Sequence, residues 1–222
     1  MKKSIKESIV IPCGEVQLQG ILSLPMNATG LILFVHGSGS SRLSPRNQFV
    51  ADKLNQAGFA TVLFDLLTEE EAQIDEIDAS LRFDIPFLAD RLVKCTQFFM
   101  KEVRTRALLM GYFGASTGGG AALLAAVKQE AVKAVVSRGG RPDLAGEALK
   151  QVKVPTLFIV GEQDEVVIRL NQLALEKMHC VKQLTKVPGA THLFEEAGAL
   201  EAVAELAKAW FLEYVHSSQR RP

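Results

Sequence analysis

Short apolar runs recur along the chain from residue 31 onward, and amphipathic segments separate them. The run at 31–35 is apolar at every position, which is typical of a parallel strand covered by helices on both faces. We predict such strands at residues 31–35, 60–64, 107–110, 132–136, 154–160 and 181–187. Apolar residues at helical spacing predict helices at 45–57, 84–103, 119–127, 168–178 and 199–214. This alternation predicts an α/β fold, with a mostly parallel sheet wrapped by helices.

The first 24 residues follow a different pattern. Two β-rich runs, at 5–11 and 16–24, flank a short turn segment, and we predict an antiparallel hairpin there. The end of the chain, 217–222, is a polar tail. No internal repeat or linker stands out, so residues 1–222 are expected to form one domain with a substantial core.

Residues 69–78 carry six carboxylates and no basic residue. A run of like charge is usually a solvated face, and we expect one here. The segment also follows directly after a predicted strand, so a mobile flap over a site at the strand ends is the alternative interpretation.

The stretch with the most chemical information is Gly114-Ala115-Ser116-Thr117-Gly118. A predicted strand precedes it and a helix of small residues follows it. A tight strand-to-helix corner brings backbone against backbone, so only small residues fit at the flanking positions. Such a corner exposes the serine hydroxyl at the start of the helix, in the geometry of a nucleophile elbow. We therefore predict that Ser116 is a nucleophile.

A serine hydroxyl needs a base to take its proton and a third group to orient that base. In the fold that contains this nucleophile elbow, the three groups follow along the chain in the order serine, acid, histidine. The loop after the strand at 154–160 offers Glu162, Asp164 and Glu165, and we choose Asp164 because it closes the turn. The loop after the last strand offers His192. His179 and His216 are the weaker alternatives, at a helix end and near the tail.

Amides are needed to hold the oxyanion that forms when a serine attacks a carbonyl. The strand at 31–35 runs into His36-Gly37-Ser38-Gly39, a loop of small residues where an amide can approach the carbonyl closely. We predict that the oxyanion donors are the backbone N–H groups of Ser38 and Thr117. A flexible connection without a catalytic role is the alternative for this loop. His36 precedes the elbow and is expected to orient the loop rather than to act as the base.

Four arginines lie near the predicted site: Arg42, Arg46, Arg138 and Arg141. Arg138 follows a strand at the end where open α/β sheets bind ligands. A guanidinium there can hold a carboxylate or phosphate with two hydrogen bonds. We expect Arg138 and Arg42 to bind substrate. The alternative is that Arg138 or Arg141 pairs with Asp143.

Overall composition limits the choice of partners. Lys and Arg total 25, as do Asp and Glu, so no net charge favours nucleic acid or an anionic membrane. Charged residues interrupt any signal peptide at the N-terminus, and no apolar stretch approaches the length of a membrane helix. The three cysteines, Cys13, Cys95 and Cys180, have no metal-binding spacing. We expect reduced thiols in a cytoplasmic protein that needs no metal or cofactor.

Taken together, these motifs resemble those of the α/β-hydrolases, and in particular of the dienelactone hydrolase family. The resemblance rests on the loop His36-Gly37-Ser38-Gly39, the elbow around Ser116, and the segments that carry Asp164 and His192, and it spans nearly the whole chain. It implies a three-layer α/β/α sandwich around a mostly parallel sheet of about eight strands. It also implies ester or lactone hydrolysis with Ser116 as nucleophile, His192 as base and Asp164 orienting the base.

The chain departs from that family at two points. Dienelactone hydrolases carry cysteine at the elbow, where this chain has serine. The family's carboxylate near the first oxyanion loop has no counterpart between His36 and Ser41.

The predicted function is hydrolysis of a small ester or lactone, anionic if the arginines bind it, through an acyl-enzyme on Ser116. Two other classes stay open. One is another hydrolase or acyltransferase with the same triad, such as a thioesterase, peptidase or perhydrolase. The other is a ligand-binding protein without catalysis, because one fold can host many functions.

Overall fold

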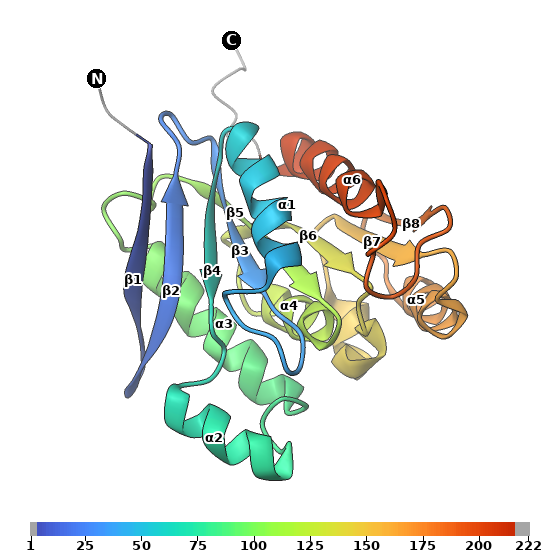
Figure 1. Cartoon of the computed structure of the whole chain (residues 1–222), viewed down its shortest axis with the longest axis horizontal. Coiled ribbons are helices and arrows are strands. Elements are labelled where there is room, and N and C mark those ends of the chain that lie inside the picture. The colour runs from blue at the N-terminus through green and yellow to red at the C-terminus, as the bar shows by residue number, and fades with distance from the viewer. Residues whose placement is uncertain (1–3, 216–222) are drawn as a thin grey trace.

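A computed structural model describes residues 4–215, in which eight strands form one sheet (Figure 1). The strand order is β1-β2-β4-β3-β5-β6-β7-β8. The hairpin strands pair antiparallel with each other, β2 pairs antiparallel with β4, and all later neighbours are parallel. The strands are β1 (Ile5–Cys13), β2 (Val16–Leu24), β3 (Gly30–Val35), β4 (Phe59–Phe64), β5 (Leu109–Ala115), β6 (Val132–Arg138), β7 (Thr156–Gly161) and β8 (Lys182–Val187). The predicted mostly parallel sheet with an antiparallel N-terminal hairpin is confirmed.

Helices cover both faces of the sheet. They are α1 (Pro45–Gln56), α2 (Glu69–Asp78), α3 (Ile85–Phe99), α4 (Thr117–Val127), the 3-10 helix η1 (Pro142–Gln151), α5 (Glu165–Lys177) and α6 (Ala199–Tyr214). Figure 1 shows α1 and α6 side by side on one face, and they are in contact with each other. Helices α3 and α4 pack together on the opposite face.

Alternation along β3 shows how a central strand supplies two cores. Ile32 and Phe34 pack into the core beneath α1 and α6, whereas Leu31, Leu33 and Val35 face the core beneath α3 and α4. All six residues of the strand are buried. An uninterrupted apolar run is therefore needed here, because successive side chains point to opposite faces and both faces are covered.

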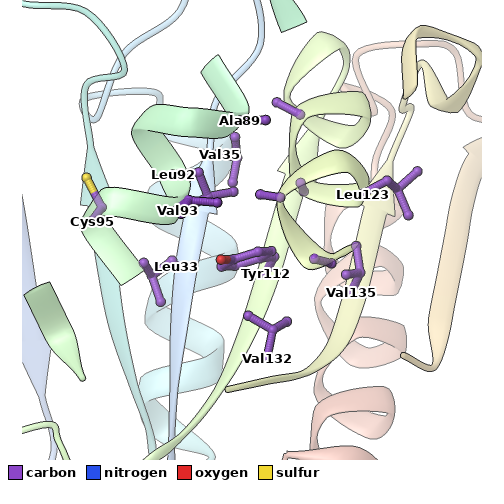
Figure 2. Packing of buried hydrophobic residues seen from close by; sticks show 14 of the residues in the cluster. Leu33, Val35, Ala89, Leu92, Val93, Cys95, Tyr112, Leu123, Val132 and Val135 are labelled. Carbon is purple, nitrogen blue, oxygen red and sulfur yellow. The ribbon is translucent and has the colours of Figure 1, made fainter. Parts of the chain in front are cut away.

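Tyr112 lies at the centre of the larger core, among side chains of the sheet and of α3 and α4 (Figure 2). Its ring is fully buried, and burial raises the pKa of its hydroxyl well above the usual value. The hydroxyl lies 2.6 Å from Oγ1 of Thr96, which itself donates to the carbonyl of Leu92. Tyr112 is therefore the donor of this bond, and its one buried polar group is satisfied.

The acidic segment forms a helix, α2. Thr68 caps it in a capping box with Glu71. The prediction of a fully solvated face is wrong for two of the carboxylates. Glu71 pairs with the buried Arg91 of α3, and Asp75 is buried and pairs with Arg82 at 2.6 Å. Arg82 and Arg91, which lie outside the segment, supply the positive charge that the segment itself lacks.

Other differences from the predicted elements concern their ends and one omission. Strand β5 extends to Ala115, past the predicted end at 110, and β6 extends to Arg138. Helix α3 ends at Phe99, before the predicted end at 103. The 3-10 helix η1 was not predicted. The polar tail and His216 lie outside the described residues.

We predict that Asp75 holds α2 and the loop after it in place. Its carboxylate accepts hydrogen bonds from the backbone of Leu81 and Arg82 and from Nε of Arg82, at 2.6–2.9 Å. Hydrogen bonds to a charged group contribute about 1.5–3 kcal/mol each, so Asp75→Asn should open this segment more often. Peptide-resolved amide hydrogen exchange should show faster exchange over residues 69–83.

Glu70→Gln is the matched control, because Glu70 is an exposed carboxylate on the same helix. Its exchange pattern should equal that of the wild type. Equal protection in Asp75→Asn and wild type would contradict the prediction.

Candidate active site

Ser116 lies at the corner between β5 and α4 with a backbone conformation of φ 51° and ψ −124°. Positive φ is unfavourable for a residue with a side chain, so the surrounding structure must hold the corner in this state. Added Cβ atoms at Gly114 and Gly118 would lie 2.6 Å and 2.2 Å from backbone oxygens, those of Gly118 and Val35. Both glycines are therefore needed for the close approach that the sequence pattern predicted.

Backbone hydrogen bonds fix this corner from two sides. The N–H of Ser116 donates to the carbonyl of Arg138, the last residue of β6, at 3.2 Å. The Ser116 carbonyl accepts from Gly119 at 2.9 Å and from Arg141 at 3.0 Å. No side chain caps the start of α4, so its first N–H groups stay available at the positive end of the helix dipole.

Asp164 and His192 form a hydrogen-bonded pair, with 2.6 Å between Oδ2 and Nδ1. The Asp164 side chain is 14% exposed, so little water competes for this bond. A carboxylate accepts, which places the proton on Nδ1 of the histidine and leaves Nε2 free to act as a base. The acid and the histidine that we predicted from chain order are therefore in contact.

The rival carboxylates have other environments. Glu162 accepts a hydrogen bond from the backbone of Gly189 at 2.9 Å, and Glu165 is the exposed first residue of α5. Asp164 uses its second oxygen, Oδ1, to accept from the backbone of Val167 at 3.4 Å as the N-cap of α5. Of the three candidates, Asp164 is the one that contacts His192.

Ser116 and His192 line one cavity of about 260 Å³, which we call the nucleophile cavity. Its other polar side chains come from Ser38, Ser40, Ser44, Arg46, Asn47 and Arg138. Among residues 4–215, no direct hydrogen bond joins Ser116 Oγ to His192. Such bonds are often long in free enzymes and tighten when substrate binds. The cavity thus brings together the predicted nucleophile and the predicted base, and the predicted base contacts the predicted acid.

The two predicted oxyanion donors are connected to each other. The N–H of Ser38 donates to Oγ1 of Thr117 at 2.8 Å, which joins the loop after β3 to the first residue of α4. In this state the Ser38 amide is occupied, and it must leave the Thr117 hydroxyl to bind an oxyanion. The Thr117 N–H is at the uncapped start of α4.

His36 orients this loop, as its sequence position indicated. Its Nδ1 lies 2.9 Å from the carbonyl of Gly37, which belongs to the same peptide unit as the Ser38 N–H. Its Nε2 accepts from the backbone of Leu66 at 3.0 Å. A neutral ring with the proton on Nδ1 satisfies both contacts, and burial lowers the pKa of His36.

The structure separates the arginines. Arg138 and Arg46 line the nucleophile cavity, but Arg42 does not; it pairs with Asp65 and lines a different cavity, near α2. The suggested pairing with Asp143 is made by Arg141, at 2.7 Å, and not by Arg138. The sequence analysis placed Arg46 near the site but did not expect it to bind substrate. Asn47 was missed, because a polar residue in the first turn of a helix carries no specific signal.

Within residues 4–215, no group of three or more His, Cys, Asp and Glu side chains is arranged to hold a metal ion. Cys13, Cys95 and Cys180 are free thiols. None of the described helices is both long and apolar enough to span a membrane.

A testable consequence of the His36 contacts is a pH dependence of stability. The pKa of His36 in the native protein is below the usual value of about 6.5. As pH falls, His36 is therefore protonated in the unfolded chain before it is protonated in the native protein. Stability should therefore decrease below about pH 6.5. Urea unfolding at pH 7.5 and 5.5 should show that the free energy of unfolding falls more in the wild type than in His36→Gln.

His179→Gln is the control for this measurement, because His179 is exposed and is not part of the loop. It should keep the wild-type pH dependence. A loss in His36→Gln as large as in the wild type would contradict the assignment.

Comparison with known proteins bears on both the family and the fold of this chain. The model of the dienelactone hydrolase family matches residues 18–216. The dienelactone hydrolase from Anabaena variabilis is 55% identical, with a TM-score of 0.95 over 97% of this chain and 100% of that chain. Est1E from Butyrivibrio proteoclasticus shares the fold at 18% identity, with a TM-score of 0.76 over 93% of this chain and 98% of that one.

Two curated proteins from Mycobacterium tuberculosis are 52% identical over 210 residues, and each carries the name "Putative phosphoribosyl transferase". The match covers 94% of this chain but 46% of each relative, so the chain spans about half the length of the curated relatives it matches. The predicted α/β-hydrolase architecture is confirmed by the solved structures. With a family model that covers most of its length, this chain belongs to the dienelactone hydrolase family.

Proposed function

We propose that this chain is a serine hydrolase that cleaves a small carboxylic ester or lactone. The observation that carries the proposal is the Asp164–His192 pair at the cavity that also contains Ser116 in its strained corner. Family membership supports a hydrolase. That it hydrolyses esters, and does so with a serine nucleophile, is our own inference beyond family membership.

The first half of the reaction forms an acyl-enzyme. Ser116 Oγ attacks the carbonyl carbon of the ester while Nε2 of His192 takes the hydroxyl proton. Asp164 keeps the ring in the correct tautomer and stabilises the imidazolium. The Thr117 and Ser38 amides hold the oxyanion, the second after it leaves the Thr117 hydroxyl. His192 then gives its proton to the leaving oxygen, and the alcohol departs.

The second half returns the free enzyme. Water enters the cavity and His192 removes its proton as the water attacks the acyl carbon. The second tetrahedral intermediate collapses, Ser116 Oγ takes the proton back from His192, and the acid is released. For a lactone the leaving alcohol stays attached to the acyl group, so one product forms.

Names of relatives bear on this proposal in two ways. A fold relative, at 14% identity and a TM-score of 0.78, is described as a dienelactone hydrolase-like promiscuous phosphotriesterase. The curated relatives are named for phosphoribosyl transfer, and more than half of their length lies outside the match. We attribute that transfer activity to the part of those proteins that this chain does not match.

The other functional classes need a different substrate or no chemistry at all. A thioesterase, peptidase or perhydrolase would use the same Ser116, Asp164 and His192. A binding protein would have no need for a strained serine beside a hydrogen-bonded Asp–His pair. A panel of short esters, lactones and thioesters separates the catalytic classes by their relative kcat/KM.

We expect a fluorophosphonate probe to label the wild type at Ser116, because the probe reacts with a serine whose proton has a nearby base. Labelling and ester hydrolysis should both disappear in Ser116→Ala. Ser80→Ala, an exposed serine in the loop after α2, should be labelled like the wild type. A folded wild type that resists the probe would overturn the proposal, as would full esterase activity in Ser116→Ala.

Asp164→Asn tests the choice of acid. The amide keeps an oxygen for the α5 cap but favours the wrong tautomer of His192, so kcat should fall about 10³- to 10⁴-fold. Glu165→Gln is the matched control and should retain wild-type kcat. If Glu165→Gln lost kcat in a steady-state ester assay and Asp164→Asn did not, the acid that orients His192 would be another carboxylate.

A further inference from the structure

Two buried thiols, Cys13 and Cys95, lie next to each other although they are far apart in the sequence. Cys13 is the last residue of β1 and is 2% exposed, and Cys95 lies in α3 and is fully buried. Strand β1 and helix α3 are in contact, and both thiols belong to the larger hydrophobic core. Figure 2 shows the sulfur of Cys95 directed away from Tyr112 at the centre of that core. The pair thus lies where the N-terminal hairpin meets the helical layer.

Hydrogen bonding places the two sulfurs against each other. The Cys13 thiol donates to the backbone carbonyl of Arg91 at 3.6 Å. In an α-helix such a carbonyl accepts from the N–H four residues later, which here is that of Cys95. The Cys13 sulfur therefore lies at the turn of α3 that carries Cys95, and the Cys95 thiol is its hydrogen-bonding neighbour. A disulfide requires this kind of proximity, because its two Cβ atoms are only about 4 Å apart.

The surroundings favour the thiolate of Cys13 over that of Cys95. The hydrogen bond from Cys95 lowers the pKa of Cys13 despite its burial, and the positive charges of Arg91 and Lys94 lower it further. The same hydrogen bond holds the proton on Cys95, and together with burial it raises the pKa of that thiol. The thiolate is the reactive form of cysteine, so Cys13 is the sulfur that an oxidant attacks first.

Cys180 is the third thiol and provides a contrast. It is half-buried just before β8, near the Thr156 hydroxyl and Lys182. Burial raises its pKa, and within residues 4–215 no other cysteine acts on it. Cys180 therefore has neither the reactivity of Cys13 nor a neighbouring thiol.

We propose that Cys13 and Cys95 are a site of oxidative modification, at which hydrogen peroxide forms a reversible disulfide that joins the N-terminal hairpin to α3. Neither cysteine lines the nucleophile cavity, so this inference does not depend on the proposed function. The thiols are free in the structure, which represents the reduced state.

The reaction has two steps. The Cys13 thiolate attacks one oxygen of hydrogen peroxide; an S–O bond forms, the O–O bond breaks, and the departing hydroxide takes up the proton that Cys13 lost. The Cys95 sulfur then attacks the sulfur of the Cys13 sulfenic acid; the S–S bond forms, the S–O bond breaks, and hydroxide leaves with the Cys95 proton as water. Two thiols lose two electrons, and one peroxide becomes two waters. A dithiol reductant reverses the reaction by thiol–disulfide exchange.

A small oxidant can reach Cys13 when the hairpin opens locally. Strand β1 is at the edge of the sheet and pairs only with β2, and Cys13 directly precedes the turn at Gly14. Segments at the edge of a fold open more readily than its core. Once formed, the disulfide would close a loop of about 80 residues and restrict the unfolded chain, so oxidation should raise Tm by about 5–10 °C.

The decisive experiment treats the folded wild type with hydrogen peroxide, stops the reaction with catalase and alkylates the remaining thiols. Intact-mass spectrometry should show the loss of two hydrogens, and peptide mapping should find Cys13 joined to Cys95. The rise in Tm should disappear when a dithiol is added. Cys180→Ser is the matched control and should form the same disulfide. Cys13→Ser and Cys95→Ala should form none and should keep the Tm that each has before treatment.

Two further measurements test the order of attack and the role of the fold. Dimedone traps sulfenic acids: it should label Cys13 in Cys95→Ala, where the second thiol is missing, and should not label Cys95 in Cys13→Ser. Peroxide treatment of the wild type in concentrated urea should give mixed pairs that include Cys180, because the unfolded chain no longer selects the partner of Cys13.

Three outcomes would overturn the proposal: a folded wild type that keeps all three thiols free, a disulfide that includes Cys180, or dimedone labelling of Cys95 rather than Cys13. The mapping of the wild type and of Cys180→Ser decides the matter even if a variant at Cys13 or Cys95 fails to fold. None of these readouts involves Ser116, so their failure would leave the serine hydrolase proposal intact, and a wild type that resists the fluorophosphonate would leave the disulfide proposal intact.

Discussion

The close contact between the start of α4 and the end of β3 determines the geometry of the site. Gly118 lies so near the Val35 carbonyl that a Cβ atom would come within 2.2 Å of it. The corner at Ser116 and the loop after β3 are therefore in backbone contact, and the distance between Ser116 and the Ser38 amide is set by main chain rather than by flexible side chains. The hydrogen bond that Ser116 donates to the carbonyl of Arg138 in β6, and the one it accepts from Arg141, complete the support of the corner.

Much of this arrangement could be predicted from the sequence because it depends on local rules. Apolar runs indicate doubly covered strands, and the glycines beside Ser116 indicate a tight corner. In a parallel sheet, residues that follow successive strands gather at one edge, which brings Asp164 and His192 together although 28 positions separate them. The role of His36 in the loop followed from its place before the elbow.

Other features depend on pairing across the chain and could not be predicted locally. Residues 69–78 look like a solvated acidic run until Arg82 and Arg91 are seen to neutralise Asp75 and Glu71. Which of Arg42 and Arg46 lines the nucleophile cavity was equally open from the sequence, because both follow the same loop. It was decided by Asp65, which pairs with Arg42 and keeps it away from the nucleophile cavity.

Asp164 has two tasks, and this affects how the protein can change. One carboxylate oxygen contacts His192 and the other caps α5. Catalytic residues are often strained or poorly solvated, so their loss commonly makes a protein more stable. Here the same side chain contacts His192 and begins a helix, and its removal harms both. Under the proposed function, mutational drift toward a stable but inactive protein is thus disfavoured at this position, and selection for folding alone helps to retain Asp164.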